Sequence, residues 1–570
     1  MRRFIFYLTF ILISSDHISG QQIFLDEDFS DWNGSHVKSY ADPAGDGKSN
    51  GADITDVRIS NDETYLFLYI DINNEINLQS SNDLTIYIDT DNNINTGLSK
   101  NGIGAEIVYY FGERNGLYYG ANFNRQIYHN DLSLVTLPTV TSERFELCIA
   151  RKYFYGTSGA TMGNQIKIIF SDESLSGDIA PNGNGGYTYS FNNNLKYTPK
   201  PFSIKKENAD HLRIMSYNVL RDNLFDPFTQ NAFRRIFQAS KPDIIGFCEI
   251  YDNSSLQTAN LIETFLPPTG NQTWYHSEVN PDIRVVSRYP VIDKRSINGN
   301  GAFLIDLGTE HLVFIVMHLP CCENENDRQL EVDNVMSFVR SVRYGISPFQ
   351  VAQNTSVIIL GDTNLVGFRS QQQTLITGDI YNNNTYGPDF DPDWDDTALE
   401  DAKPAVTNLP STFTWNSSQG SFSAGRLDYV VYTGSVMELK NAFSLWTPSL
   451  TSAQLAETGL QAGDVETASD HLPVVCDFLL PGVSGTADGD NQDPNIQLKW
   501  VDDELIITSV AFPDGDIHIS IVDIMGRILA HYTLTESENE INIHPHIIPG
   551  GLFIITIQTN HGIKSIRLIR

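Results

Sequence analysis

Short apolar runs that carry a polar residue at one end recur between residues 211 and 481. Such runs predict buried strands. In the first four runs the polar residue follows the apolar stretch, and in the last two it precedes it. In chain order the polar residues are Asn218, Glu249, His318, Asp362 with Asn364, Asp428, and Asp470 with His471. They share one edge only if the last two strands run opposite to the others, so we predict a mixed sheet with a chemical site at one edge.

Helical spacing separates these runs. In NAFRRIFQAS the residues Phe233, Ile236 and Phe237 fall on one face, and RQLEVDNVMSFVRSVR shows the same spacing of apolar residues. Strands alternating with helices predict an α/β domain over residues 211–481.

The flanking segments have a different pattern. Residues 21–195 hold strand-like runs such as TYLFLYIDI, separated by Asn, Asp and Gly clusters, and predict an all-β sandwich. Residues 196–210 are a linker rich in Pro and Lys, and residues 482–495 are a Gly/Asp/Pro linker. Residues 496–570 predict a small β module without a catalytic group of residues.

The N-terminus is typical of a signal peptide. Arg2 and Arg3 precede FIFYLTFILI and a stretch of small residues, which predicts a signal peptide over residues 1–20. The apolar stretch is too short to span a bilayer, and no later one is long enough. We therefore expect an exported protein without a transmembrane segment.

The charge limits the partners of the chain. Its 570 residues predict about three domains. With 37 basic and 70 acidic residues the net charge is −33, which disfavours non-specific binding of duplex nucleic acid. It does not exclude a nuclease whose metal ion neutralises charge locally.

The cysteines do not indicate a disulfide framework. Five cysteines cannot all pair within one chain. Cys148, Cys248 and Cys476 lie in apolar runs and are expected in the core. Cys321 and Cys322 form either a vicinal disulfide or two free thiols. Zinc is not expected, because no second Cys or His pair has ligand spacing.

Asp362 and Asn364 form the sharpest motif. At positions i and i+2 of an extended segment they face one side, where a carboxylate and an amide can hold a water or a phosphate oxygen. The alternative is an ordinary Gly-Asp turn at a strand end. Glu249 also ends an apolar run, and a carboxylate there suits Mg²⁺ or Mn²⁺ better than Zn²⁺.

Two histidines are candidates for proton transfer. His471 follows Asp470, and Asp428 is a candidate to orient its imidazole. His318 can donate a hydrogen bond to a phosphate oxygen. Taken alone, each histidine is more often structural.

Seven motifs together resemble the endonuclease/exonuclease/phosphatase family with the DNase I-like fold. They are RIMSYNVL, GFCEI, RVVSRYPV, VMHLP, ILGDTN, GRLDYVVY and SDHLPVV. The resemblance implies a four-layer α/β sandwich flanked by the two β modules, and metal-dependent hydrolysis of phosphate esters. His318 stands where DNase-like and sphingomyelinase-like members keep a histidine. Arg288, in SRYP, is expected to contact phosphate.

The resemblance also implies roles for the other residues of the motifs. Glu249 would be the metal ligand, supported by Asn218, and Asp470 would join the metal or the second histidine. Asp362 and Asn364 would orient the nucleophile, and His471 with Asp428 would act as acid/base or stabilise the phosphate.

The N-terminal segment resembles family 9-like carbohydrate-binding modules through DWNG, DITDVRIS and IDTDNNINTG followed by GAE. This implies a polysaccharide partner, with a spacer role as the alternative. Asp89, Asp91 and Asn93 could bind calcium with Glu106, or form a polar turn rich in Asx residues.

The C-terminal module resembles the type A sorting domain of the type IX secretion pathway through VDIMGR, IIPGGLFIITI and KSIRLIR. This implies contact with that secretion machinery and a secreted or cell-surface location. The alternative is a small adhesion-like β-sandwich.

The sequence thus predicts a secreted phosphodiesterase that uses Mg²⁺ or Mn²⁺, with extracellular nucleic acid as the first choice of substrate. One alternative is a sphingomyelinase-like phospholipid phosphodiesterase or a phosphomonoesterase. Another is a non-catalytic surface or glycan-binding protein. The general base and the oligomeric state are left open.

Overall fold

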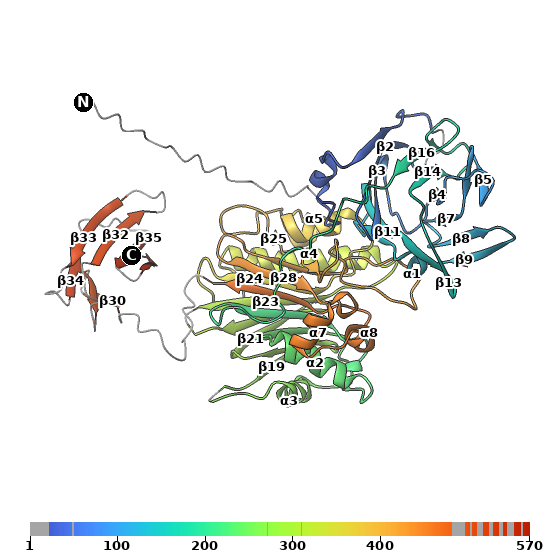
Figure 1. Cartoon of the computed structure of the whole chain (residues 1–570). Helices are drawn as coiled ribbons and strands as arrows, with labels where there is room; N and C mark the ends of the chain where they lie inside the picture. The colour runs from blue at the N-terminus through green and yellow to red at the C-terminus, as the bar shows by residue number, and fades with distance from the viewer. Residues whose placement is uncertain are drawn as a thin grey trace, which may run out of the picture. The chain divides into compact units, whose positions relative to one another are not determined.

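The computed structural model forms two compact units that divide between Gly485 and Thr486 (Figure 1). The described residues are 22–47, 51–270, 272–308, 310–480, 496–501, 504–509, 517–523, 528–534, 540–543, 552–559 and 562–569. The expected signal peptide and the linker at 482–495 lie outside them. Within the described residues, no helix is long and apolar enough to cross a membrane.

The N-terminal part of the first unit is rich in sheet, as predicted. A five-stranded sheet has the order β1-β2-β3-β11-β10, and a seven-stranded sheet has the order β15-β14-β4-β7-β8-β9 with β16 beside β14. Apolar residues of both sheets, among them Leu68 and Ile86, share one core. The strands of these sheets are β1 Lys38–Ala41, β2 Ile54–Asn61, β3 Tyr65–Ile76, β4 Leu84–Asp89, β7 Ile107–Tyr110, β8 Asn115–Gly120, β9 Phe123–Ile127, β10 Val135–Leu137, β11 Ser142–Ala150, β14 Gln165–Asp172, β15 Ile179–Ala180 and β16 Tyr187–Ser190. We call this part the β-sandwich.

Short elements decorate the β-sandwich. They are the hairpins β5 Leu98–Lys100 with β6 Ile103–Ala105 and β12 Lys152–Tyr155 with β13 Ser158–Thr161, the 3-10 helix η1 Phe29–Asn33 and the helix α1 His129–Leu132.

The rest of the first unit is built on two mixed sheets, with the orders β19-β20-β18-β17-β29-β28-β26 and β21-β22-β23-β24-β27-β25. The first contains β17 Leu212–Asn218, β18 Ile244–Cys248, β19 Tyr275–Val279, β20 Ile283–Ser287, β26 Ala405–Val406, β28 Glu438–Ser444 and β29 Val474–Leu479. The second contains β21 Val291–Ile297, β22 Asn300–Asp306, β23 His311–His318, β24 Ser356–Asp362, β25 Glu400–Asp401 and β27 Asp428–Tyr432.

The two sheets pack face to face, because their strands are apolar on both sides. Ile214 of β17 packs into the core between the sheets with Phe314 and Ile358, whereas Tyr217 faces outward. Helices α2 Gln230–Ser240 and α3 Ser255–Phe265 cover that outer face.

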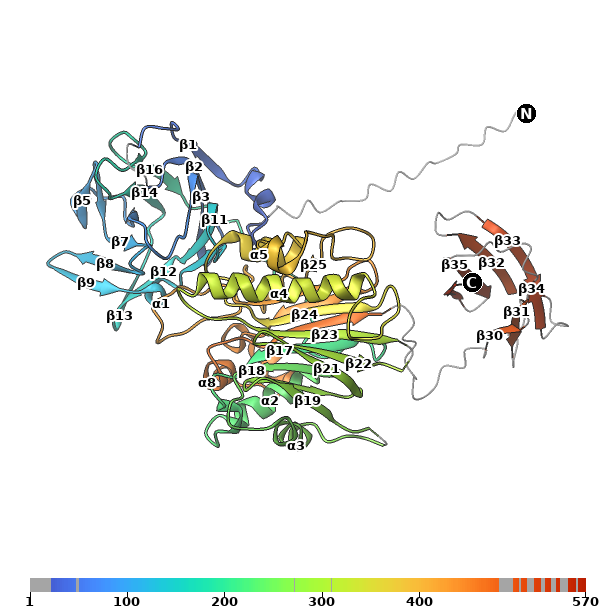
Figure 2. The same ribbon diagram turned by 180° about the vertical axis from the view of Figure 1, so that it is seen from behind.

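Helices α4 Glu325–Arg343 and α5 Arg369–Thr377 cover the other sheet, and Figure 2 shows α4 lying along β24 and β23. Val332 and Met336 of α4 pack with Met317 of β23, which confirms the helical spacing seen in the sequence. Five shorter helices complete the unit: η2 Asn223–Phe225, α6 Asn383–Tyr386, η3 Thr447–Ser449, α7 Ser452–Thr458 and α8 Asp464–Ala468.

The strand directions agree with the predicted reversal. β17 and β18 are parallel, and β29 is antiparallel to β17. Likewise β23 and β24 are parallel, and β27 is antiparallel to β24. The correction is that the strands belong to two sheets rather than one, so the shared edge is a rim where both sheets meet.

A buried ion pair joins β17 to β29. Arg213 donates from Nε and Nη2 to the two carboxylate oxygens of Asp477, at 2.6 and 2.7 Å, and both side chains are buried. Arg213 also donates to the carbonyl of Ser240 at 2.7 Å. Arg213 thus connects β17, β29 and the last residue of α2, Ser240, through its hydrogen bonds.

The second unit holds a three-stranded sheet, β30-β31-β34, and a four-stranded sheet, β33-β32-β35-β36. The strands are β30 Ile496–Val501, β31 Glu504–Ser509, β32 Ile517–Asp523, β33 Ile528–Leu534, β34 Glu540–Ile543, β35 Leu552–Thr559 and β36 Gly562–Ile569. Parts of the motifs that suggested a sorting domain, at 524–527 and 547–551, lie outside the described residues.

All five cysteines are free. Cys148, Cys248 and Cys476 are buried, and Cys321 and Cys322 are exposed thiols rather than a vicinal disulfide.

Candidate active site

Asn218 links the two sheets at the rim. It ends β17 of one sheet, and its Nδ2 donates to Glu249 Oε1 and to Asp362 Oδ2, both at 3.0 Å. Its Oδ1 accepts the N–H of Leu220 at 3.0 Å. One buried amide thus holds two carboxylates that come from different sheets.

Glu249 is aimed into the site by its backbone. It follows β18 with a φ of 64°, in the left-handed region, which costs a non-glycine residue about 1 kcal/mol. The N–H of Arg221 donates to its Oε2 at 2.9 Å, and Asn218 holds its Oε1. These two hydrogen bonds therefore fix the orientation of the Glu249 carboxylate.

Asp362 lies at the centre of the site. Its Oδ2 is 3.5 Å from His471 Nε2 and 3.7 Å from His318 Nε2. Gly361 precedes it with a φ of 131°, and a Cβ there would lie 2.0 Å from the carbonyl oxygen of Met317, so only glycine fits. Asn364 donates its N–H to Asp362 Oδ1 at 3.2 Å.

The side-chain amide of Asn364 makes a hydrogen bond to the backbone of a neighbouring loop. Its Nδ2 donates to the carbonyl of Leu319 at 3.0 Å, which ties the loop after β24 to the loop after β23.

His471 forms a buried pair with Asp428. Its Nδ1 lies 2.8 Å from Asp428 Oδ2. Burial by itself lowers the pKa of His471, but the charges of Asp428 and Asp362 outweigh it and raise this pKa to about 10. The hydroxyl of Ser469 accepts the N–H of His471 at 3.1 Å and donates to the carbonyl of Asn218 at 2.9 Å.

His318 has a similar partner, Asp282, which the sequence analysis did not single out. His318 Nδ1 is hydrogen-bonded to Asp282, and His318 Nε2 is 3.9 Å from Glu249 Oε1. Burial lowers the pKa of His318, but Asp282, Asp362 and Glu249 together raise it to about 9. The sequence contains a pattern that indicates this role, because Asp282 precedes the apolar run of β20 as Asp428 precedes that of β27.

Asp470 and Arg288 are two predicted site residues whose side chains have other partners. Asp470 accepts the indole N–H of Trp415 on Oδ2 at 3.1 Å, and no group of described residues able to hold a metal includes it. Its Oδ1 is buried without a partner in the described part of the chain.

Arg288 is not brought to the site, which corrects the expected phosphate contact. Because β20 is antiparallel to β18, with Ile244 opposite Ser287, residue 288 lies at the far end of β18 from Glu249. Its guanidinium stacks 3.8 Å from the ring of Trp274 and donates to a backbone carbonyl.

The donors at the rim fit a divalent cation. Glu249, His318 and Asp362 each offer one ligand atom, and these atoms lie within 4.8 Å of one another. Among the described residues, the ion pairs of Glu249, Asp282, Asp362 and Asp428 involve histidine only. Close carboxylates without Lys or Arg partners favour a divalent cation as the neutralising charge.

A second acidic cluster lies in the β-sandwich. Asp89, Asp91 and Glu106 offer ligand atoms within 4.8 Å of one another, and Glu106 Oε1 is buried without a partner among the described atoms. Asn93 donates its backbone N–H to Asp89 and Asp91, and its side-chain oxygen accepts the N–H of Asn95 at 3.2 Å. The first three residues fit a cation better than Asn93 does.

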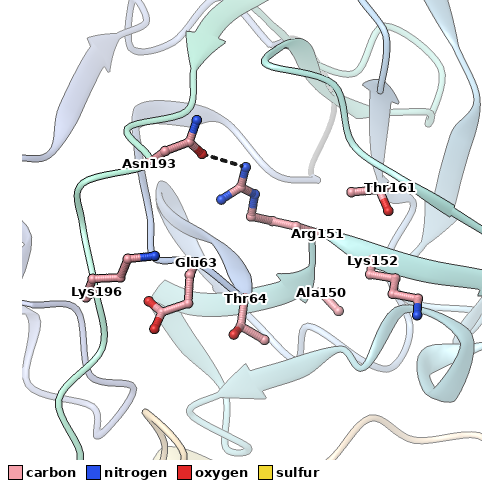
Figure 3. A pocket seen from close by; sticks show the side chains of 8 residues that line it. All are labelled: Glu63, Thr64, Ala150, Arg151, Lys152, Thr161, Asn193 and Lys196. Atoms are coloured by element: carbon pink, nitrogen blue, oxygen red, sulfur yellow. Dashed lines mark hydrogen bonds between the residues drawn. The ribbon is translucent and has the colours of Figure 1, made fainter.

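The β-sandwich also carries a basic hollow, drawn in Figure 3, although the chain is strongly acidic. Arg151 lies over the ring of Phe191 and donates to Asn193 Oδ1 at 3.1 Å. The residues that line it are Glu63, Thr64, Ala150, Arg151, Lys152, Thr161, Asn193 and Lys196.

Two packed mixed sheets with a site of carboxylates and histidines at their rim define an α/β domain of the DNase I-like class. Residues 215–471 match the Endonuclease/Exonuclease/phosphatase family, so this part of the chain is similar to the members of that family. No curated protein gives a significant match.

Several solved structures are similar to the chain. The human Nocturnin catalytic domain with bound sulfate is 16% identical, with 47% of this chain and 94% of that chain covered and a TM-score of 0.29. Truncated Caenorhabditis elegans TDP2 is 15% identical, with coverages of 47% and 97% and a TM-score of 0.31. An endonuclease/exonuclease/phosphatase from Beutenbergia cavernae DSM 12333 is 18% identical, with coverages of 63% and 100% and a TM-score of 0.28.

Proposed function

We propose that residues 211–481 hydrolyse phosphate esters with the help of Mg²⁺ or Mn²⁺, and that the substrate is a phosphodiester of extracellular nucleic acid. The family match supports the hydrolase class. The observation that carries the proposal is the position of Asp362 between two histidines, each held by its own aspartate.

Glu249 would hold the metal, with Asn218 fixing its carboxylate, and Asp362 lies close enough to share in binding. Asp470 stays a proposed further ligand through its unpartnered Oδ1. When bound, the cation would neutralise the charge that develops on the phosphate.

Side chains of the protein would supply the remaining catalytic roles. Asp428 and Asp282 fix the Nδ1 of His471 and His318, so the Nε2 of each ring faces the site and can donate to phosphate oxygens. Asp362, held by Asn218, accepts a hydrogen bond from the attacking water and, with Asn364, sets its line of approach. As water attacks phosphorus and the bond to the leaving oxygen breaks, His471 would protonate that oxygen, in keeping with its raised pKa, and the proton released by the water would restore the imidazolium.

The test is a substrate panel on the full chain. Wild type, Glu249→Gln, His471→Ala and the control Glu263→Gln, an exposed glutamate of α3, are given plasmid DNA, RNA, sphingomyelin and an aryl phosphate. Each is assayed with Mg²⁺, Mn²⁺ or EDTA. We expect EDTA-sensitive cleavage of nucleic acid that only the two site variants lose. Turnover of lipid or aryl phosphate alone moves the substrate to those classes, and no turnover contradicts the hydrolase.

A second candidate function concerns the β-sandwich, which we propose binds polysaccharide. The basic hollow around Arg151, Lys152 and Lys196 favours an acidic glycan. We expect the full chain to bind a polyuronate, and this binding should be weakened in Arg151→Gln with Lys196→Gln but not in the control Lys167→Gln, a half-buried lysine of β14 outside the hollow. Equal binding of a neutral glycan would contradict this preference.

We also propose export by the signal peptide and type IX secretion to the cell surface or medium, supported by the motifs at both ends of the sequence. Removal of residues 496–570 should retain the protein inside a host that has this pathway. Continued release would contradict the proposal.

A further inference from the structure

One edge of the β-sandwich lies against two loops of the active site. The first loop, residues 365–369, follows Asn364. The second, residues 423–426, precedes Asp428. Residues 135–141 of the β-sandwich, comprising β10 and the segment after it, contact both loops.

The contacts to the first loop are directional. Thr141 donates its N–H to the carbonyl of Gly367 at 2.7 Å, and its hydroxyl accepts the N–H of Arg369 at 3.0 Å. Asn77 Nδ2 donates to the carbonyl of Val366 at 2.7 Å. Three successive hydrogen bonds therefore fix the backbone just after Asn364.

The contacts to the second loop lead to a catalytic histidine. Val135 of β10 pairs with Ala424, Gly425 pairs with Trp415, and Trp415 pairs with His471. The hydroxyls of Thr136 and Ser423, both buried, are 2.8 Å apart. Backbone pairing thus runs from the β-sandwich to His471.

Thr139 contacts both loops at once. Its hydroxyl lies 2.6 Å from the carbonyl oxygen of Leu365 and 3.2 Å from that of Arg426, so its single proton is shared between them. Leu365 is next to Asn364, and Arg426 is two residues before Asp428. A Cβ on Gly425 would lie 2.7 Å from Thr139 Cγ2, so the two segments are in close contact.

We propose that the β-sandwich is a structural part of the active site, and that Thr139 is a positioning residue that sets the loops carrying Asn364 and Asp428. This rests on the proposed function of the site. A module that served only as a spacer has no need of buried hydrogen bonds to the loops beside the site. Small displacements of catalytic groups lower turnover strongly, so loss of this hydroxyl should reduce kcat by about tenfold to a hundredfold, with KM changed by less than about threefold.

The experiment compares Thr139→Val with the rescue variant Thr139→Ser in the full chain. The matched control is Thr55→Val, because Thr55 is also a half-buried threonine of the β-sandwich whose hydroxyl donates to a backbone carbonyl, that of Asp71, at 3.2 Å. We measure kcat and KM on the substrate that the wild type hydrolyses, and hydrogen exchange of peptides that cover 363–369 and 423–428. Only Thr139→Val should lose kcat and exchange protection in both peptides.

The other possible results distinguish failure of this proposal from failure of the proposed function. Unchanged kcat in Thr139→Val overturns the proposal, as does an equal loss in Thr55→Val or no recovery in Thr139→Ser. A wild type that hydrolyses nothing refutes the proposed function instead. Hydrogen exchange then decides the positioning of the loops by itself, and unchanged protection in Thr139→Val overturns it.

Discussion

His471 Nδ1 lies 2.8 Å from Asp428 Oδ2, and both side chains are buried. The carboxylate fixes the tautomer and the orientation of the ring. Asp428→Asn should keep the fold but lower kcat by about 10²- to 10⁴-fold, because the amide can turn its donor toward the ring.

Single-turnover kinetics of Asp428→Asn, His471→Ala and the double variant test this. Because the two residues act as a unit, the double variant should be no slower than His471→Ala. Additive losses would contradict a working pair.

Asn218→Ala should weaken metal binding. Loss of the amide leaves Glu249 and Asp362 without their shared donor and facing each other as like charges. We expect the Kd for Mn²⁺, measured by calorimetry, to rise about tenfold or more. Asn253→Ala, in the loop after β18, is the control, and a Kd unchanged in Asn218→Ala would show that the amide does not organise the site.

Calcium should stabilise the β-sandwich through Glu106. Its buried Oε1 has no partner in the described part of the chain, and Asp89 and Asp91 lie within ligand distance. Ca²⁺ at millimolar concentration should raise the melting temperature by about 2–4 °C. Glu106→Gln should abolish this shift, and the exposed-site variant Glu113→Gln should keep it. A wild type that melts at the same temperature with and without Ca²⁺ excludes the site.

Asp477→Ala should destabilise the α/β domain by about 3–5 kcal/mol, because it leaves the guanidinium of Arg213 buried and unpaired. Glu457→Gln removes an exposed pair with Lys205 and should cost less than about 1 kcal/mol. Urea unfolding followed by tryptophan fluorescence compares them, and equal midpoints would contradict the difference in burial.

Asp31 should make stability depend on pH. Burial, with the charges of Asp26 and Asp28 nearby, raises the pKa of Asp31 to about 7. A carboxyl with a raised pKa stabilises the folded protein while it is protonated, and this contribution is lost as pH rises from about 4 toward 7.

Asp31→Asn should therefore gain about 1–2 kcal/mol relative to wild type between pH 4.5 and pH 8, less than the full shift corresponds to, because solvent screens a carboxyl that is not fully buried. Urea midpoints at the two pH values measure the gain. A difference between the proteins that is the same at both pH values would show that Asp31 titrates normally.

Sequence patterns predicted the strands and their directions because burial and polar strand ends are local features. These patterns could not assign the strands to two separate sheets, because a strand buried on both faces has the same apolar pattern in either sheet. β20 runs antiparallel to β18, so Asp282 before it lies at the site and Arg288 after it lies at the far end, a direction that its apolar run alone does not report. The contact of Thr139 with the site depends on packing between distant segments, which no local pattern reports.

The hydrogen bonds from residues 135–141 to the loops of the hydrolase constrain how such a chain can evolve. A gene fusion that exchanged the β-sandwich at the linker 196–210 would join two well-folded pieces and still leave the loops after Asn364 and before Asp428 without their outer support. We therefore expect the two parts to be inherited together, with sequence changes on one side of this contact matched by changes on the other.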